Sequence, residues 1–225
     1  MTTPGSPAGL PSHGGTGLLL APGASAGRDQ SALVAIDAAA TLAGATVARM
    51  DFPYREAGRR APDREPVLLA AVRQEVEALS AQSGLPVGRL ILGGRSMGGR
   101  MCSMAAAEGL DVLGLALVSY PLHPPGRPDR LRTAHFERLR VPCLFVSGTR
   151  DAFGSPEELE EATKAIPGKV THVWFDGKDH SLRNADAEVA RVVVSWLVRV
   201  GLRRRRRGGL VLEGSDTPYH PGNRA

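Results

Sequence analysis

The stretch "LILGGRSMGG", residues 90–99, joins a run of aliphatic residues to a serine that stands between two pairs of glycines. Short aliphatic runs bounded by glycine are typical of buried strands. The small residues that continue to Gly109 have the pattern of a helix with a glycine stop. We therefore expect a strand over 89–94 that turns sharply into a helix over 98–109, with Ser96 at the turn.

The turn itself, Gly94-Arg95-Ser96-Met97-Gly98, fits the pattern G-x-S-x-G of a nucleophile elbow. The serine of such an elbow exposes its hydroxyl at the end of a strand, in a strained backbone conformation. Side chains two positions before and after the serine would collide, so Gly94 and Gly98 are needed. The helix that follows directs its first N–H groups at any negative charge that develops near the serine.

Outside this stretch, strands and helices are expected to alternate. Aliphatic runs predict strands over 17–22, 45–54, 89–94, 112–121, 141–149 and 169–175, and helical periodicity predicts helices over 30–44, 64–84, 98–109, 155–166 and 184–200. Continuous aliphatic strands are typical of a parallel sheet that is covered on both faces. The sequence therefore predicts a doubly wound α/β fold, a mostly parallel sheet flanked by helices, with its site beyond the carboxyl ends of the strands.

Composition divides the chain into three parts. Residues 1–16, rich in Gly, Pro, Ser and Thr, are expected to be flexible, 17–200 to form the folded domain, and 201–225 to form a disordered basic tail. The net charge is +5, and the tail, with six arginines against two acidic residues, supplies +4 of it. Because the domain is nearly neutral, we do not expect a nucleic-acid partner, although Arg203–Arg207 could contact phosphates or an acidic protein.

Two cysteines, Cys102 and Cys143, lie in apolar segments. We expect buried thiols rather than a disulfide, which indicates a reducing, cytoplasmic location. No run approaches the roughly eighteen uncharged apolar residues of a membrane span, and no basic region precedes an apolar one at the N-terminus, so neither a membrane nor a secretory signal is expected. The oligomeric state is not predicted.

A nucleophilic serine needs a base, and the base needs an orienting acid. Asp151 follows the strand 141–149 and His180 follows the strand 169–175, so both are expected at the sheet edge that carries Ser96. Asp176 and Asp179 compete for the role of the acid, but they lie in the histidine's own loop, where solvation is the commoner role. The other histidines are weaker candidates for the base: His172 within a strand, His123 and His135 in the connection after 112–121, and His13 and His220 near the ends of the chain.

A second match to G-x-S-x-G occurs at 23–27, centred on Ser25. No strand precedes the strand before Ser25, and three polar residues separate it from the next helix, so we interpret this stretch as a loop rather than an elbow. Two backbone N–H groups are needed to stabilise an oxyanion, and we expect them from Met97 and Ala24, with Gly23 allowing a close approach of the loop.

Candidate residues of the substrate pocket are Tyr54, Arg55, Arg95, Arg100 and His123. Arginines near the serine would favour an acidic acyl substrate. The alternative is that Arg95 and Arg100 make structural ion pairs near the elbow.

At these residues the chain resembles the α/β-hydrolase superfamily, in its small lidless form related to dienelactone hydrolase. Four stretches resemble a narrower group of predicted hydrolases, which includes a testis-expressed protein and a subunit of the non-specific lethal chromatin complex: "DFPYREAGRRAPDR" (51–64), "GGRSMGGRM" (93–101), "YPLHPPGRP" (120–128) and "GTRDAFG" (148–154). With the His180 loop, the resemblance covers about residues 17–200.

The resemblance implies an α/β-hydrolase fold in which the first two strands of the superfamily are absent or degenerate, and it implies neither a metal nor an organic cofactor. It does not fix the substrate. Relatives often carry His-Gly where this chain has Pro22-Gly23. Proline has no N–H group, but the expected donor is Ala24, so the oxyanion hole is retained and the effect of Pro22 on activity stays open.

We therefore expect a serine hydrolase that cleaves an ester-like bond, a carboxylester or a thioester, through an acyl-enzyme. The connection 121–140 leaves little room for a lid, which favours a small soluble substrate. One alternative is a non-catalytic protein-interaction module on a hydrolase fold, which the basic tail mildly favours. Another is an acyltransferase that uses the same three residues, which the sequence does not distinguish from a hydrolase.

Overall fold

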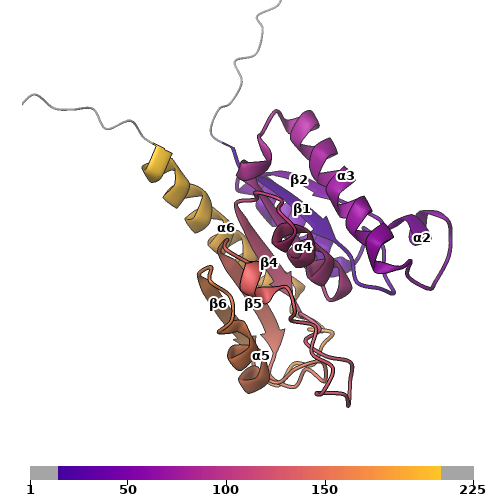
Figure 1. Cartoon of the computed structure of the whole chain (residues 1–225). Coiled ribbons are helices and arrows are strands. Elements are labelled where there is room, and N and C mark those ends of the chain that lie inside the picture. Colours follow the sequence, from indigo (N-terminus) through magenta and orange to yellow (C-terminus); the bar gives the residue numbers. More distant parts are fainter. Residues whose placement is uncertain (1–14, 209–225) are drawn as a thin grey trace, which may run out of the picture.

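The computed structural model describes residues 15–208, with side chains described as far as Gly201 (Figure 1). The strands are β1 Gly17–Ala21, β2 Thr46–Arg49, β3 Leu90–Arg95, β4 Gly114–Val118, β5 Cys143–Gly148 and β6 Val170–Phe175. The α-helices are α1 Ser31–Leu42, α2 Pro53–Glu56, α3 Glu65–Ser83, α4 Met97–Ala107, α5 Pro156–Thr163 and α6 Asp186–Gly208, and the 3-10 helices are η1 Val87–Arg89 and η2 Phe136–Arg138. The described residues do not include most of the segment expected to be flexible, most of the basic tail, or His13 and His220.

The sheet is parallel throughout its described part, with the strand order β2-β1-β3-β4-β5-β6. Ala21 at the end of β1 lies opposite Gly94, and Arg95 at the end of β3 lies opposite Val118 at the end of β4. Because parallel strands end at the same edge, the segments that follow β1, β3 and β4 meet there. The predicted doubly wound α/β fold is confirmed.

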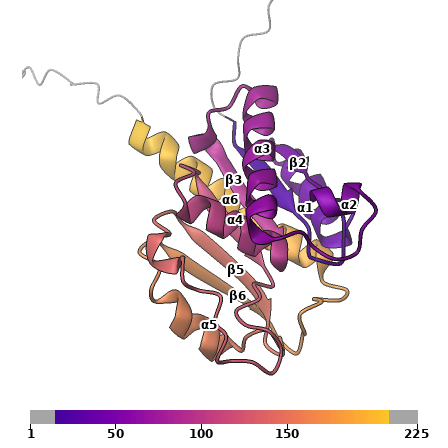
Figure 2. The same ribbon diagram turned by 45° about the vertical axis from the view of Figure 1, so that its right-hand side comes forward.

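Helices cover both faces of the sheet, as the two views of the ribbon show (Figure 2). Alternate residues of β1 face opposite layers, so that Leu18 and Leu20 pack with α1 and α6, whereas Leu19 and Ala21 pack with α3 and α4. This alternation is the period of two that a strand imposes on its side chains. Burial on both faces explains why the strands read as continuous aliphatic runs.

Two elements differ from the sequence-based expectation. The strand expected over 45–54 ends at Arg49, and α2 begins at Pro53, because proline has no N–H group for a sheet and fits the first turn of a helix. The last helix, expected over 184–200, continues to Gly208. Residues 201–208 are therefore helical rather than irregular, which agrees with the good helix propensity of arginine.

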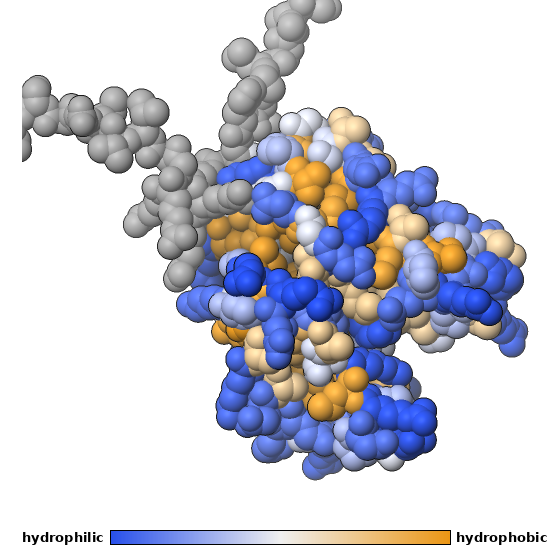
Figure 3. All heavy atoms as spheres, viewed as in Figure 1, coloured by the Kyte–Doolittle hydropathy of each residue, from blue (hydrophilic) through white to orange (hydrophobic). Residues whose placement is uncertain are grey.

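The solvent-facing surface in Figure 3 is mostly hydrophilic, with apolar side chains in patches between the polar ones. No helix among the described residues is both long enough and apolar enough to cross a membrane. Cys102 and Cys143 are buried and free, as expected, and burial raises the pKa of each thiol to about 12.

Candidate active site

The backbone at Ser96 has the strained conformation that an elbow requires. Its φ of 51° and ψ of −117° lie where residues other than glycine are rare, and Ser96 lies directly between β3 and α4. Its N–H donates to the carbonyl of Val118 at 2.9 Å, and its own carbonyl accepts from the N–H of Arg100 at 3.1 Å. The two bonds fix the turn against both β4 and the first turn of α4.

Glycine is needed on both sides of this turn because the end of β3 and the first turn of α4 both pass against the end of β1. A Cβ atom at Gly94 would lie 2.5 Å from the carbonyl oxygen of Ala21, and one at Gly98 would lie 2.2 Å from the same oxygen. These are backbone contacts, which cannot move aside as the end of a flexible side chain can. At Gly23 the expected close approach is absent, because a Cβ atom there would meet nothing nearer than 3.7 Å.

The contrast between these glycines predicts a large stability difference. Gly98→Ala should lower the free energy of unfolding by about 3 kcal/mol or more, since overpacking against backbone forces the elbow and β1 apart. Gly23→Ala is the matched control and should lower it by less than about 1 kcal/mol. Urea unfolding of both variants measures the two values. Equal losses would contradict the geometry of the elbow.

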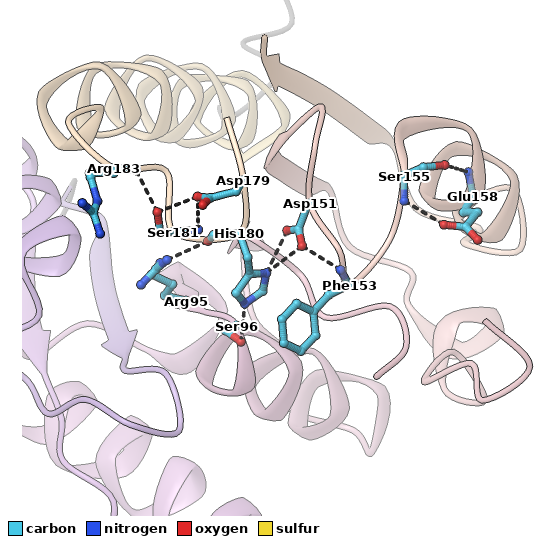
Figure 4. Close-up of polar contacts among 10 residues, drawn as sticks. All are labelled: Arg95, Ser96, Asp151, Phe153, Ser155, Glu158, Asp179, His180, Ser181 and Arg183. Atoms are coloured by element: carbon cyan, nitrogen blue, oxygen red, sulfur yellow. Dashed lines mark hydrogen bonds and ion pairs between the residues drawn. The ribbon is translucent and has the colours of Figure 1, made fainter. Parts of the chain in front are cut away.

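Ser96, His180 and Asp151 form one continuous chain of polar contacts (Figure 4). Nε2 of His180 lies 2.9 Å from Oγ of Ser96. Nδ1 of His180 lies 2.9 Å from Oδ1 and 2.8 Å from Oδ2 of Asp151. The Asp151 side chain is 2% exposed and that of His180 is 21% exposed, so the acid is buried and the base is partly open to solvent.

Several contacts hold the imidazole in this position. The ring of Phe153 lies over it, with centroids 4.0 Å apart, and the Phe153 N–H donates to Oδ1 of Asp151 at 2.8 Å. Nη2 of Arg95 donates to the backbone carbonyl of His180 at 2.7 Å. A neutral imidazole that donates from Nδ1 to Asp151 has Nε2 free to accept the serine proton.

The loops that carry the acid and the base are packed on each other. The N–H of Arg150 donates to the carbonyl of Lys178 at 2.9 Å. A Cβ atom at Gly148 would lie 2.1 Å from that same carbonyl oxygen, so only glycine permits the approach. The ends of β5 and β6 therefore bring Asp151 and His180 together across 29 residues of sequence.

The competing acids are engaged elsewhere in the structure. Asp179 is exposed and accepts from the hydroxyl of Ser181 at 2.5 Å and from its N–H at 2.9 Å, and these two bonds hold the pKa of Asp179 below its usual value. Asp176 accepts from the hydroxyl of Thr149 at 3.2 Å. The competing serine, Ser25, lies in an exposed turn, as expected of a loop, and within the described residues no hydrogen bond joins its side chain to a histidine, whereas Ser96 is bonded to His180.

The competing histidines are also occupied by structural contacts. His172 lies between the rings of Phe145 and Trp174, and burial lowers its pKa. His135 is bonded to the buried hydroxyl of Ser103 at 2.8 Å, and burial lowers its pKa to about 4.

A cavity of about 490 Å³ opens beside Ser96 and His180. Ala24 and Met97, the expected oxyanion donors, both line it. The loop of Ala24 is fixed from behind, since the Gly23 N–H donates to Oε1 of Gln30 at 3.1 Å and the Tyr54 hydroxyl donates to the Ala24 carbonyl at 2.7 Å.

Three of the residues expected in the substrate pocket do not line this cavity. Tyr54 is fully buried and supports the Ala24 loop from behind. His123 is buried and contacts Glu158 at 3.3 Å, and Arg55 lines a neighbouring hollow beside Asp51. Sequence proximity to a strand end does not determine where a side chain points.

Arg95 and Arg100 do line the cavity, and they differ in their partners. Nη2 of Arg100 makes an ion pair with Glu65 at 2.7 Å, as the structural alternative expected. Arg95 is bonded to a backbone carbonyl instead, and burial lowers its pKa. Phe153 and Arg132 are among the lining residues that were not predicted. Phe153 lies in the quoted stretch 148–154, to which only Asp151 contributed a predicted role, and no motif in the sequence marks Arg132. No group of three or more His, Cys, Asp or Glu residues within the described range could hold a metal ion.

Comparison with known proteins agrees with this architecture. The family model described as alpha/beta hydrolase domain matches residues 15–192. Similar solved structures include Est1E from Butyrivibrio proteoclasticus, with a TM-score of 0.70 and 15% identity over 84% of this chain and 89% of that chain. Dienelactone hydrolase from Anabaena variabilis has a TM-score of 0.67 and 17% identity over 84% and 88%, and the esterase domain of a Rhodothermus marinus protein has 0.63 and 21% over 84% and 88%.

Proposed function

The chain belongs to the alpha/beta hydrolase domain family, and from this premise we propose that it is a serine hydrolase that cleaves an ester-like bond of a small soluble molecule. The observation that carries the proposal is the unbroken series of contacts from Ser96 through His180 to Asp151, at 2.9 Å and 2.8 Å. A strained serine, an adjacent base and a buried orienting acid are what nucleophilic acyl transfer needs.

The proposed reaction has two steps. Oγ of Ser96 attacks the acyl carbon while Nε2 of His180 takes its proton, and the N–H groups of Ala24 and Met97 stabilise the oxyanion. The C–O or C–S bond then breaks, and His180 returns the proton to the leaving alcohol or thiol. In the second step His180 takes a proton from water, which attacks the acyl carbon of the acyl-enzyme. The bond from the acyl carbon to Oγ of Ser96 then breaks, His180 returns the proton to Oγ, and the acid leaves. Asp151 holds the imidazole and stabilises its charged form throughout.

The volume of the cavity and the short connection between β4 and β5 support a small substrate. Its volume of about 490 Å³ suits a molecule well below the size of a long-chain lipid. Between Val118 at the end of β4 and Cys143 at the start of β5, the only helical element is the three-residue η2. A lid of several helices is therefore not part of this proposal.

Two finer points belong to the same proposal. The four quoted stretches support a relationship to the narrower group with the testis-expressed protein and the chromatin-complex subunit. The buried thiols support a cytoplasmic location.

There are two competing functions: transfer of the acyl group to another acceptor, and a purely protein-binding role. The contact of Ser96 with His180 favours acyl transfer over the protein-binding role.

Hydrolysis of short 4-nitrophenyl esters and the corresponding thioesters tests the proposal. We expect release of 4-nitrophenolate from the esters, or of 4-nitrothiophenolate from the thioesters, above the buffer rate, with an initial burst of about one equivalent per chain if deacylation is the slow step. Added amines and alcohols separate hydrolysis from transfer, because a transferase would form the new ester or amide in preference to the free acid. No release from any of these substrates by folded protein would contradict the proposal and favour the protein-binding role.

A further inference from the structure

The cavity beside Ser96 carries more positive charge than the proposed chemistry uses. Its charged lining consists of Arg95, Arg100, Arg132, Asp63 and Glu65, together with His180. Each of the two acids already has an arginine partner: Glu65 pairs with Arg100 at 2.7 Å, and Asp63 pairs with Arg59 at 2.7 Å. Neither acid therefore neutralises Arg95 or Arg132.

The Arg95 guanidinium donates to the backbone carbonyl of His180 and so helps to hold the His180 loop. Among the described residues, the Arg132 side chain makes no comparable bond. Within the described part of the chain, the Arg132 guanidinium makes no hydrogen bond and no ion pair. It is partly buried, and its pKa is lowered by burial and by the positive charge of Arg100. A partly desolvated cation beside another cation costs free energy unless an anion binds between or beside them.

The backbone of Arg132 is nevertheless held firmly in place. Its N–H donates to the carbonyl of Leu122 at 2.8 Å, and its carbonyl accepts from the buried hydroxyl of Tyr120 at 2.7 Å. Both partners directly follow β4, so Arg132 is anchored to the end of the strand next to the elbow. An arginine presented from a fixed backbone is prepared to bind, because less conformational entropy is lost when a ligand arrives.

We propose that Arg132, with Arg100 beside it, forms a carboxylate-binding subsite of this cavity, so that the preferred substrate is a monoester or thioester of a short dicarboxylic acid. The planar guanidinium fork matches a carboxylate in two parallel hydrogen bonds. The free carboxylate binds at Arg132, and the acyl carbon at the other end of the chain reaches Ser96 in the same cavity. This inference rests on the proposed function of Ser96.

The test compares a charged and a neutral ester of similar length. The ratio of kcat/KM for 4-nitrophenyl glutarate to kcat/KM for 4-nitrophenyl pentanoate should exceed one for the native protein. Arg132→Gln should lower this ratio about 10- to 100-fold, the range given by one hydrogen bond to a charged group. Arg132→Lys, which keeps the charge but loses the fork, should give an intermediate ratio.

Arg130→Gln is the matched control, because Arg130 is exposed, lies two residues away and does not line the cavity. It should leave both kcat/KM values as they are in the native protein. All these changes preserve the backbone carbonyl that holds Tyr120, so the variants are expected to fold. A native ratio of one or below, or an equal fall of the ratio in Arg130→Gln and Arg132→Gln, overturns the subsite.

Direct binding separates a failure of the subsite from a failure of the proposed function. Calorimetric titration with glutarate should give at least about tenfold weaker binding in Arg132→Gln than in the native protein and in Arg130→Gln. If neither ester turns over but glutarate binds in this pattern, the proposed function has failed and the subsite stands. Equal binding by all three proteins overturns the subsite, and tighter binding of inorganic phosphate than of glutarate overturns its assignment to a carboxylate.

Discussion

Ser96→Ala should reduce ester turnover by a factor on the order of 10⁴ or more, to a rate near that of the buffer. The change removes the one oxygen that lies 2.9 Å from Nε2 of His180, and alanine offers no other nucleophile at the elbow. The protein should stay folded, because the backbone bonds of residue 96 to Val118 and Arg100 do not involve the hydroxyl. Initial rates on a short 4-nitrophenyl ester, with circular dichroism and urea unfolding, measure both effects.

Ser83→Ala provides the matched serine control for this result. Ser83 is the last residue of α3, at the opposite end from the cavity residues Glu65 and Leu68, and its hydroxyl donates to the carbonyl of Leu79. The Ser83→Ala variant should turn over the ester at the native rate. Substantial esterase activity retained by folded Ser96→Ala would mean that another group is the nucleophile.

Asp151→Asn should reduce kcat on the order of 10⁴-fold with little change in the fold. Both carboxylate oxygens of Asp151 lie within 2.9 Å of Nδ1 of His180, and they fix the tautomer whose Nε2 accepts the serine proton. An amide that presents its NH₂ group to Nδ1 would favour the opposite tautomer, and it would not stabilise the charged imidazole. Steady-state kinetics should show the loss mainly in kcat, because Asp151 does not line the cavity.

The matched acid control is Asp179→Asn, which changes the residue next to His180. Asp179 is exposed and bonded to Ser181 rather than to the imidazole, so this variant should retain most of the native turnover. If Asp179→Asn lost as much kcat as Asp151→Asn, the assignment of Asp151 as the orienting acid would be wrong.

The parts of this structure that sequence predicts well are those with a strong local pattern. The aliphatic strands, the glycines at 94 and 98 and the strand-end positions of Ser96, Asp151 and His180 follow from periodicity, turn sterics and the common edge of a parallel sheet. Pro53 also indicates a helix start in the sequence, because proline favours the first turn of a helix, and α2 begins there although a strand was expected to continue.

Other features depend on contacts between distant segments and have no local pattern. Tyr54 was expected in the substrate pocket, but its hydroxyl reaches back across 30 residues to the carbonyl of Ala24. Gly148 looks like an ordinary strand-end glycine until the loop of Lys178 is packed against it. Arg132 lies in an irregular part of the connection after β4, and its backbone bonds to Leu122 and Tyr120 hold it in the cavity wall.

Intact mass after reaction with a fluorophosphonate probe tests the central claim, that Ser96 is an activated nucleophile, most directly. The activated serine displaces fluoride from phosphorus, whereas unactivated serines do not react on the same timescale. We expect one adduct on the native chain and on Ser25→Ala, which removes the competing match to the elbow pattern, and no adduct on folded Ser96→Ala. No adduct on the folded native chain, or an adduct that persists in Ser96→Ala, would contradict the account.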